Sequence, residues 1–260
     1  MRTRFFDRPG CPHPANSVLA RSARHLRALA DAWLPANCAL CSLPPSIKMR
    51  SEAGICDGCI ERLPGVGAQR CPICAIRLPA GAPVDTSCAQ CAHSPPAFER
   101  TVALADYAPP LDRLIHAMKF GSDLAAARAL GRLLAVRVQS HDDLRPQLLV
   151  PVPLAPARLA TRGYNQSEAI ARALARSLDV PLARNALLRI RETAPQSSLA
   201  LAGRNANLQH AFTATIRLEN RVVGLVDDVM TSGATLQAIG RALKQAGARR
   251  VVNLVAARTP

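Results

Sequence analysis

The segment that most constrains the fold of this chain runs from Val222 to Ala246. An apolar, β-branched run ends in two adjacent carboxylates, Asp227 and Asp228, and a short turn rich in hydroxyl groups and glycine leads into a helical sequence from Leu236. β-branched residues favour strands, whereas the Ala- and Leu-rich segment favours a helix. The segment therefore predicts a buried strand with an acidic tip, a loop of the size that holds a phosphate, and a helix.

The loop has the chemistry of an anion site. Unpaired N–H groups and the positive end of the dipole make a helix N-terminus suitable for an anion. Hydroxyl donors come from Thr231, Ser232 and Thr235, and Gly233 followed by Ala234 lets the backbone close around a phosphate. The two carboxylates stand where acceptors can hold sugar hydroxyls. The alternative is an ordinary polar strand-to-helix turn; a Walker A loop is excluded because its motif is absent.

Eight of the nine cysteines form four C-x-x-C pairs, separated by 14, 11 and 13 residues. The pairs are Cys38/Cys41, Cys56/Cys59, Cys71/Cys74 and Cys88/Cys91. One pair places two thiolates on one side of a tight turn, and two pairs complete a tetrahedral zinc site. We therefore predict two structural four-cysteine zinc sites. Pairing in sequence gives two ribbons, and a cross-braced pairing is the alternative.

Other uses of these cysteines have weaker support. Disulfides need an export signal, which the N-terminus does not carry. A thioredoxin-like site needs one C-x-x-C in a βαβ setting. An iron–sulfur cluster is compatible with the same spacing. Cys11 and His93 are interpreted as bystanders and not as ligands.

The charge and composition of the chain bear on its partners. The formal net charge is +15, which attracts polyanions such as nucleic acid or phosphorylated substrates. Aromatic residues make up only 3% of the chain, which argues against a surface built to stack bases. No apolar run approaches the roughly 18 residues that span a bilayer, and no secretory signal is present, so we expect a cytoplasmic protein.

The chain divides by composition into four parts. We expect a disordered leader (1–16), an N-terminal helix (17–35), a double zinc ribbon (36–97) and an α/β domain (98–260). Alternating strands and helices in the last part predict a parallel sheet flanked by helices, with ligands at the carboxyl ends of the strands. Within it, Ser122 is expected to cap a helix over 123–139, and 156–166 is expected to be a polar loop.

Three further clusters of polar residues accompany the phosphate-sized loop. Lys119 stands before a Phe-Gly turn that ends at Gly121, and a flexible ammonium there can reach a pyrophosphate. Arg158 and Arg162 flank a loop that continues Gly-Tyr-Asn-Gln to residue 166 and can close over an anionic ligand. A third cluster begins at Arg189 and includes Arg191, Thr193, Gln196, Leu199, Arg204 and Asn207. The first two clusters also have a simpler interpretation as solvated surface, and the third could equally be a nucleic-acid contact surface.

Taken together, these motifs resemble the ComF family of competence-associated, phosphoribosyltransferase-like proteins. The elements that carry the resemblance are the C-x-x-C series, the run V-P-V-P-L…R…R-G-Y-N-Q, the segment R-x-T-x-x-Q, and L-V-D-D-V-M-T-S-G-A-T. The resemblance covers about residues 26 to 258. It implies a small N-terminal zinc-ribbon module followed by a type I phosphoribosyltransferase-like parallel sheet flanked by helices.

The resemblance also implies a ligand and a function. The protein would bind phosphoribosyl pyrophosphate (PRPP) with magnesium, with the 5′-phosphate on Thr231 to Thr235, the ribose on Asp227 and Asp228, and the pyrophosphate near Lys119 and Gly121. Catalysis would involve the two aspartates, Lys119 and Arg162, in a phosphoribosyltransferase linked to natural transformation. The alternative is a non-catalytic protein that handles single-stranded DNA, with a regulatory or vestigial PRPP site. Single-stranded DNA and competence proteins are therefore candidate partners.

Overall fold

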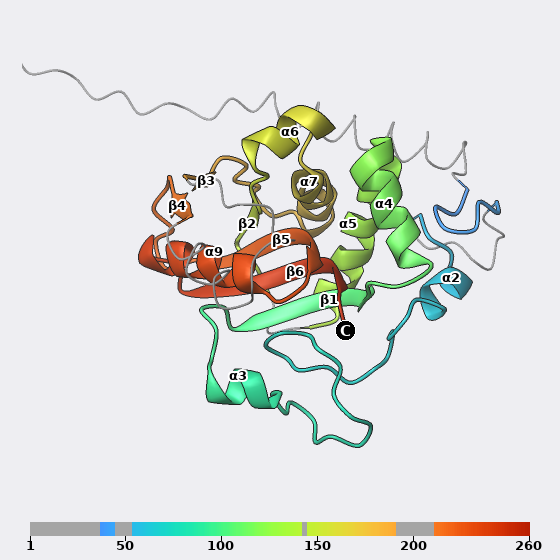
Figure 1. Cartoon of the computed structure of the whole chain (residues 1–260), viewed down its shortest axis with the longest axis horizontal. Coiled ribbons are helices and arrows are strands. Elements are labelled where there is room, and N and C mark those ends of the chain that lie inside the picture. Colours follow the sequence, from blue (N-terminus) through green and yellow to red (C-terminus); the bar gives the residue numbers. More distant parts are fainter. Residues whose placement is uncertain (1–36, 45–53, 142–144, 191–210) are drawn as a thin grey trace, which may run out of the picture.

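The structure of the chain, a computed structural model, describes residues 37–44, 54–141, 145–190 and 211–260 (Figure 1). Several sequence-based expectations lie outside these ranges. They are the leader (1–16) with Cys11, the N-terminal helix (17–35), and the polar cluster of Arg191, Thr193, Gln196, Leu199, Arg204 and Asn207.

The centre of the molecule is a four-stranded parallel sheet. Its strands lie in the order β1 (Arg100–Asp106), β6 (Arg250–Arg258), β5 (Val222–Met230) and β2 (Leu148–Pro151). Val226 of β5 pairs in register with Leu254 of β6 and with Pro151 of β2. The central strands are almost wholly buried, as expected where helices cover both faces of a parallel sheet. The predicted parallel sheet is confirmed.

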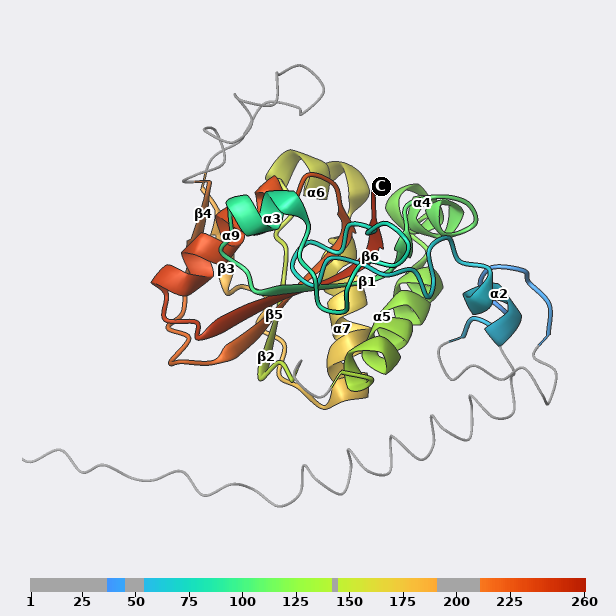
Figure 2. The ribbon, with the colours of Figure 1, turned by 90° about the horizontal axis from the view of Figure 1, so that it is seen from below.

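Helices cover both faces of the sheet (Figures 1 and 2). One face packs against α4 (Leu111–Gly121), α5 (Leu124–Gln139) and α7 (Gln166–Leu178). The other face packs against α9 (Ala234–Gln245) and a small antiparallel pair of strands, β3 (Leu187–Arg189) and β4 (Phe212–Ala214). A Cβ at Gly131 of α5 would lie 2.5 Å from the carbonyl oxygen of Ile170, so glycine permits the close approach of α5 and α7.

Alternate residues of each strand supply two separate cores. Leu149 and Leu254 belong to the core beneath α4, α5 and α7, whereas Leu148 and Val255 belong to the core beneath α9. Successive side chains of a strand point to opposite faces, so an apolar strand can serve both layers at once. This explains why the strand sequences are apolar without alternation.

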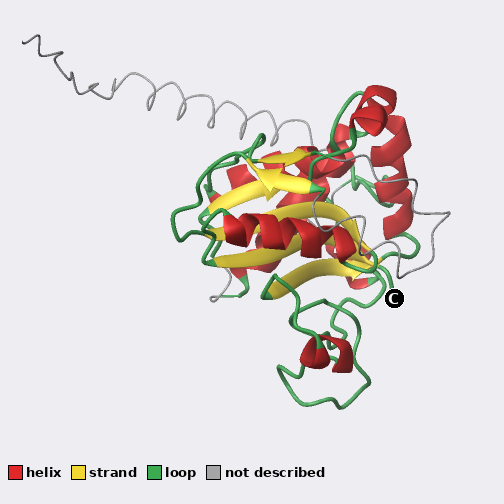
Figure 3. Cartoon of the chain, turned by 60° about the vertical axis from the view of Figure 1, so that its left-hand side comes forward, coloured by secondary structure: helices red, strands yellow, loops and turns green. Residues whose placement is uncertain are grey.

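The cysteine-rich segment contributes to both cores. Ile55 and Leu63, near α2 (Asp57–Glu61), pack with the core of α4 and α5, and Figures 1 and 2 show α2 on that side of the molecule. Ala75 packs with the core of α9, and α3 (Ala89–His93) stands outside the helical layers (Figure 3). The two halves of this segment therefore contribute to the cores on opposite faces of the sheet.

Two local expectations are wrong. The segment expected as a loop contains a helix, α6 (Pro156–Arg162), which begins with proline and ends at Gly163, whose φ is 74°. Proline is favoured in the first turn of a helix, and glycine is favoured at a C-terminal cap with left-handed backbone angles. The sequence therefore contains a start signal and a stop signal for this helix. The cap of α5 is Asp123 and not Ser122. Its carboxylate accepts hydrogen bonds from the N–H groups of Ala125 and Ala126, at 2.8 and 3.0 Å.

Among the residues that the structure describes, no helix combines the length and the apolar composition needed to cross a membrane.

Candidate functional site

A cleft of about 390 Å³ opens at the carboxyl ends of strands β2 and β5. This is the edge at which open parallel sheets bind ligands. Its lining includes eight residues that the sequence singled out: Lys119, Arg158, Arg162, Gln166, Asp227, Asp228, Thr231 and Thr235. The cleft therefore gathers side chains from α4, α6, the tip of β5 and the start of α9.

The turn between β5 and α9 has the geometry of an anion site. Gly233 caps α9 with a φ of 79°, a left-handed conformation that favours glycine, and α9 has no side-chain cap. The first helical hydrogen bond joins the N–H of Gln237 to the carbonyl of Gly233, at 2.8 Å. The N–H groups before Gln237 therefore have no helical partners, although that of Ala234 donates to the hydroxyl of Ser232 at 3.4 Å. Thr231 and Thr235 line the cleft, and Ser232, Gly233 and Ala234 form the turn between them.

Asp227 is held at the tip of β5 by two donors. The hydroxyl of Ser167 donates to its Oδ1 at 2.8 Å, and the N–H of Asp228 donates to the same oxygen at 2.9 Å. Burial, followed by the negative charge of Asp228, raises the pKa of Asp227 to about 7, although both hydrogen bonds and Lys119 act in the opposite direction. This carboxyl group therefore changes its charge near neutral pH.

Asp228 forms an ion pair across the cleft with Lys119. The Nζ of Lys119 lies 3.1 Å from Oδ2 of Asp228, and both side chains are largely buried. Lys119 lies in the last turn of α4. Gly121 ends that helix and is not among the residues that line the cleft. The structure therefore brings Lys119 to the acidic tip but leaves Gly121 apart from it.

The motif Gly-Tyr-Asn-Gln at the start of α7 ties three elements together. The hydroxyl of Tyr164 donates to the carbonyl of Met118, the residue before Lys119. The amide nitrogen of Asn165 donates to the carbonyl of Val152 at 2.9 Å, and its amide oxygen accepts from the N–H of Ser167 at 3.0 Å. These residues hold α4, α7 and the end of β2 at fixed positions around the cleft.

Gln166, the last residue of that motif, is buried and lines the cleft. Its Oε1 accepts from Nη1 of Arg162 at 3.3 Å, whereas its Nε2 has no partner in this structure. The guanidinium of Arg162 also lies 5.4 Å from the ring centroid of Phe120, within the range of a cation–π contact. A buried donor without a partner is costly, so its persistence at a cleft points to a ligand or a water.

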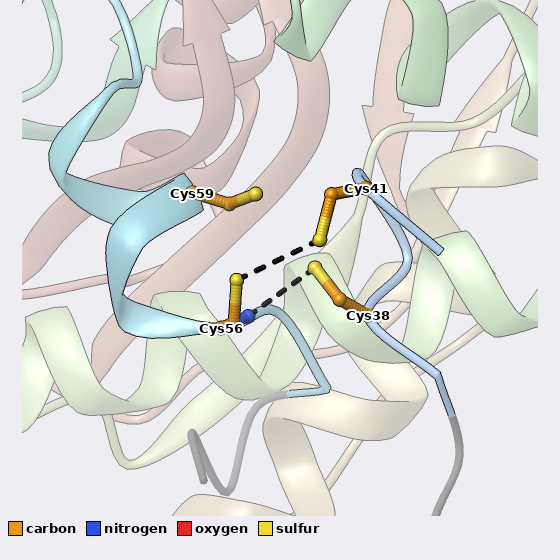
Figure 4. A group of neighbouring side chains, drawn as sticks. All are labelled: Cys38, Cys41, Cys56 and Cys59. Atoms are coloured by element: carbon orange, nitrogen blue, oxygen red, sulfur yellow. Dashed lines mark hydrogen bonds between the residues drawn. The ribbon is translucent and has the colours of Figure 1, made fainter. Parts of the chain in front are cut away.

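The eight paired cysteines form two compact groups, Cys38/Cys41/Cys56/Cys59 and Cys71/Cys74/Cys88/Cys91 (Figure 4 shows the first). In each group all four sulfur atoms lie within 4.8 Å of one another. The Sγ atoms of Cys41 and Cys56 are 3.8 Å apart, and those of Cys74 and Cys88 are 3.6 Å apart. Sulfurs bound tetrahedrally at about 2.3 Å from one zinc ion lie roughly 3.8 Å from each other. The pairs therefore combine in sequence, as in two zinc ribbons.

Within each group the surroundings shift the pKa values of the thiols in different directions. Burial opposes ionisation of Cys38, but N–H donors from Cys41 and Cys56 outweigh it and lower the pKa to about 6. Burial and the neighbouring thiols raise the pKa of Cys59, and the same causes raise that of Cys91. Four thiolates cannot gather in such a space without a cation, so each group suits a metal ion that neutralises part of the charge.

Sequence reasoning missed three residues of the cleft: Tyr107, Ser167 and Thr259. Ser167 follows the Gly-Tyr-Asn-Gln motif directly, and that adjacency is the one local signal that could have marked it. Tyr107 and Thr259 follow strands β1 and β6, and only the order of strands in the sheet brings these strand ends to the cleft. Arg189, at the start of the third polar cluster, also lines the cleft.

Comparison with known proteins gives consistent matches. Residues 165–259 match the phosphoribosyl transferase domain family. The DNA utilization protein YhgH of Escherichia coli is 36% identical over 225 residues, which are 84% of this chain and 95% of that protein. Competence protein F of Haemophilus influenzae is 32% identical over 208 residues, which are 77% of this chain and 89% of that protein. A solved purine phosphoribosyltransferase from Pyrococcus horikoshii, 19% identical over 60% of this chain and 76% of that chain, gives a TM-score of 0.28, too low to support an argument.

Proposed function

Because this chain belongs to the ComF family of competence-associated, phosphoribosyltransferase-like proteins, we propose that it binds Mg-PRPP in the cleft and acts as a phosphoribosyltransferase linked to natural transformation. One observation carries the proposal. The acidic pair Asp227 and Asp228, the turn from Thr231 to Thr235 and Lys119 all belong to one cleft at the carboxyl edge of the sheet.

The 5′-phosphate of PRPP occupies the turn from Thr231 to Thr235. The first N–H groups of α9, the positive end of its dipole and the hydroxyls of Thr231 and Thr235 all favour a dianion there. The carboxylates of Asp227 and Asp228 accept hydrogen bonds from the ribose hydroxyls. In this arrangement the N–H and hydroxyl groups of the turn donate hydrogen bonds to the phosphate oxygens. The ribose hydroxyls donate to the carboxylates of the protein.

The pyrophosphate group lies on the side of Lys119. The ammonium of Lys119 is paired with Asp228 in this structure and exchanges that partner for an oxygen of the ligand. Arg158 and Arg162 line the same cleft and add positive charge. Gly121 does not line the cleft and has no part in this proposal.

The reaction is a displacement at the anomeric carbon of the ribose. The bond from C1 to the pyrophosphate oxygen breaks, and the electron pair leaves with pyrophosphate. A bond from C1 to the nucleophile of the acceptor forms, and the nucleophile loses a proton if it carries one. The carboxylates beside the ribose stabilise the positive charge that develops on the sugar ring. Magnesium, when bound with PRPP, would neutralise charge on the leaving group.

The α6 helix covers this chemistry. Arg158 and Arg162 of α6 line the cleft, and Gly163, which caps the end of α6, gives the backbone the freedom of a hinge. Closure of α6 over bound PRPP excludes water and so prevents hydrolysis of the reactive sugar.

The two cysteine groups hold structural zinc, one ion each. Four sulfur ligands in a closed tetrahedron leave no open position for a substrate, which is typical of a structural site. The segment 36–97 is then a double zinc ribbon, and 98–260 is the phosphoribosyltransferase-like domain.

The proposal is tested by calorimetry with Mg-PRPP, followed by an assay for pyrophosphate release with candidate acceptors. Binding with release supports an enzyme. Binding without release, with or without acceptors, identifies PRPP as a regulatory ligand. Absence of binding at millimolar Mg-PRPP refutes the assignment of the cleft.

The second candidate function is the handling of single-stranded DNA. A separate groove of about 450 Å³ between α5, α6 and α7 carries Arg128, Arg172 and Arg176, with Arg172 paired to Glu168 at 2.6 Å. Two relatives are named for DNA utilization and competence. Arginine side chains bind phosphate, and the net charge of +15 adds attraction at a distance. Fluorescence anisotropy with a labelled oligonucleotide tests this function directly.

A further inference from the structure

Arg258, at the end of β6, is a buried cation that forms no ion pair with a carboxylate among the residues that the structure describes. The residue is 8% exposed, and every acceptor that the structure gives it is neutral. A buried guanidinium without a counter-charge is strongly unfavourable. Its register partner Asp106 pairs with Arg70 and Arg77, so a further negative charge close by would stabilise Arg258.

The second cysteine group lies directly beside Arg258. The Nε of Arg258 donates to the carbonyl oxygen of Cys74 at 3.0 Å, and Cys74 is one of the four sulfur ligands. Nearby, Arg70 donates to the carbonyl of Ala75 at 3.0 Å and pairs with Asp106 at 2.6 Å. Arg77 also pairs with Asp106.

A metal in the second cysteine group would change the charge beside Arg258. Arg258 and Arg70 donate to the carbonyls of Cys74 and Ala75, and Arg70 and Arg77 share the carboxylate of Asp106. A zinc ion with four thiolates carries about −2. The loaded site therefore supplies negative charge next to Arg258.

Arg258 also reaches the phosphate-sized turn. Its Nη1 donates to Oγ1 of Thr259 at 3.1 Å and makes a longer contact of 3.4 Å with the carbonyl of Met230. The N–H of Thr259 donates to the same carbonyl at 3.0 Å. Met230 immediately precedes Thr231, and its Cε would lie 2.6 Å from a Cβ added at Gly233. The side chain of Met230 thus packs close against Gly233, and its main chain leads directly into the turn that begins at Thr231.

We propose that Arg258 is a positioning residue that couples the second zinc site to the phosphate-binding turn. Zinc bound at Cys71, Cys74, Cys88 and Cys91 holds the guanidinium in place, and the guanidinium holds the carbonyl of Met230, from which the turn begins. Occupancy of this site therefore sets the affinity of the turn for a phosphate. This inference rests on the proposed function of the cleft.

The first cysteine group has a different place in the fold. Cys38 packs in the core beneath α4 and α5, on the opposite face of the sheet from α9. Loss of metal there affects the stability of that core and not the turn before α9. The two zinc sites are therefore predicted to differ in their effect on ligand binding.

The test uses the full chain, ribose 5-phosphate as the probe, and the variants Arg258→Met and Arg258→Lys. Arg241→Met, at an exposed position of α9, is the matched control. We expect Arg258→Met to bind ribose 5-phosphate about 10-fold more weakly, as loss of a charged hydrogen-bonding group implies. It should also release one of its two zinc equivalents to a chelator faster than the wild type.

Arg258→Lys separates charge from geometry. We expect it to retain zinc because it keeps the positive charge, but to bind the probe weakly because an ammonium lacks the planar fork that reaches both carbonyls. If Arg258→Met does not fold, the affinity of Arg258→Lys for ribose 5-phosphate still provides the comparison with the wild type. By linkage, saturating ribose 5-phosphate should raise the zinc affinity of one site in the wild type and not in Arg258→Lys.

Two results overturn the inference. The first is wild-type affinity for the probe in Arg258→Met or Arg258→Lys. The second is a lower melting temperature with unchanged affinity below it, which indicates a purely structural role. If the wild type itself binds neither ribose 5-phosphate nor Mg-PRPP, the proposed function fails, and the coupling fails with it. If the wild type and both Arg258 variants bind ribose 5-phosphate with equal affinity, the coupling is refuted but the proposed function of the cleft is not.

Discussion

The hydroxyl of Ser167 donates a hydrogen bond to the carboxylate of Asp227, at 2.8 Å, and so joins the first turn of α7 to the tip of β5. Burial raises the pKa of Asp227 to about 7, and this hydrogen bond limits the rise because it favours the ionised form. The charge at the centre of the cleft is therefore adjustable near neutral pH, and Ser167 is one of the groups that set it.

Replacement of Ser167 by alanine should raise the pKa of Asp227 further, because a donor to the ionised carboxylate is lost. If ribose and magnesium bind the ionised form, the affinity for Mg-PRPP rises as pH increases through about 7, and the variant should show the same rise at higher pH. Calorimetry between pH 6 and roughly 9 measures the midpoint. Ser177→Ala, at an exposed position of α7, is the control; an unchanged midpoint in Ser167→Ala contradicts the prediction.

The same pKa predicts a change in the stability of the unliganded protein with pH. The ordinary pKa of aspartate is about 3.9, so between that value and about 7 the folded state binds more protons at Asp227 than the unfolded state does. The contribution of Asp227 to the free energy of unfolding therefore falls as pH rises through this window. In Asp227→Asn this contribution should be absent, which denaturant unfolding at a series of pH values can measure.

Replacement of both Asp227 and Asp228 by asparagine should weaken Mg-PRPP binding by about 10-fold or more, since charge-assisted hydrogen bonds contribute roughly 1.5–3 kcal/mol each. The fold should survive, because the change also removes the repulsion between two adjacent carboxylates. Calorimetry gives the affinity and thermal unfolding gives the control. Unchanged affinity in a folded double variant would refute the role of the acidic pair.

Lys119→Met should affect the two ends of the ligand unequally. Removal of the ammonium should weaken the binding of pyrophosphate and Mg-PRPP but leave the affinity for ribose 5-phosphate within about twofold, because Lys119 comes from α4 whereas the N–H groups proposed to bind the 5′-phosphate come from the start of α9. Lys244→Met is the matched control, since Lys244 forms an ion pair with Glu99 at the far end of α9. Equal losses for all three ligands would argue that Lys119 acts through the fold.

The parallel sheet and the two cysteine groups could be predicted from the sequence because both have strong local signals. The run into Asp227 is too apolar to be anything but a buried strand, and C-x-x-C turns specify their geometry over four residues. Which pairs combine depended on the fold. Sequential and cross-braced pairing have the same spacing, and the docking of the two halves on opposite faces of the sheet distinguishes them.

The errors arose where a local signal was ambiguous or a partner was distant. Arg158 and Arg162 suggested a polar loop because α6 has no buried residue and so shows no apolar stripe. The link from Arg258 to Cys74 joins residues 184 positions apart, and the link from Ser167 to Asp227 joins residues 60 apart. Contacts of this kind follow from the order of strands in the sheet, which a single sequence does not display.

Metal analysis should find close to two zinc ions per chain in protein purified without a chelator, because each cysteine group has the size of a tetrahedral site. Cys56→Ser and Cys88→Ser should each lower the content toward one ion, since each disrupts a different group. One ion in the wild type would mean that only one group assembles. No metal together with few free thiols would indicate disulfides instead.

The groove between α5, α6 and α7 is the candidate site for single-stranded DNA. The groove with Arg128, Arg172 and Arg176 shares with the cleft none of the residues that line it, so single-stranded DNA held there should bind independently of Mg-PRPP. Asp227→Asn/Asp228→Asn should then keep its affinity for an oligonucleotide. The affinity for the oligonucleotide should fall steeply with salt, and removal of Arg128 should lower the slope of that dependence only slightly if several cations share the contact.

If the DNA strand instead crosses the cleft, Mg-PRPP and the DNA must weaken each other's binding by the same factor. Anisotropy with a labelled oligonucleotide, at constant ionic strength and free magnesium, distinguishes the two, and clear competition by Mg-PRPP would show that the DNA enters the cleft.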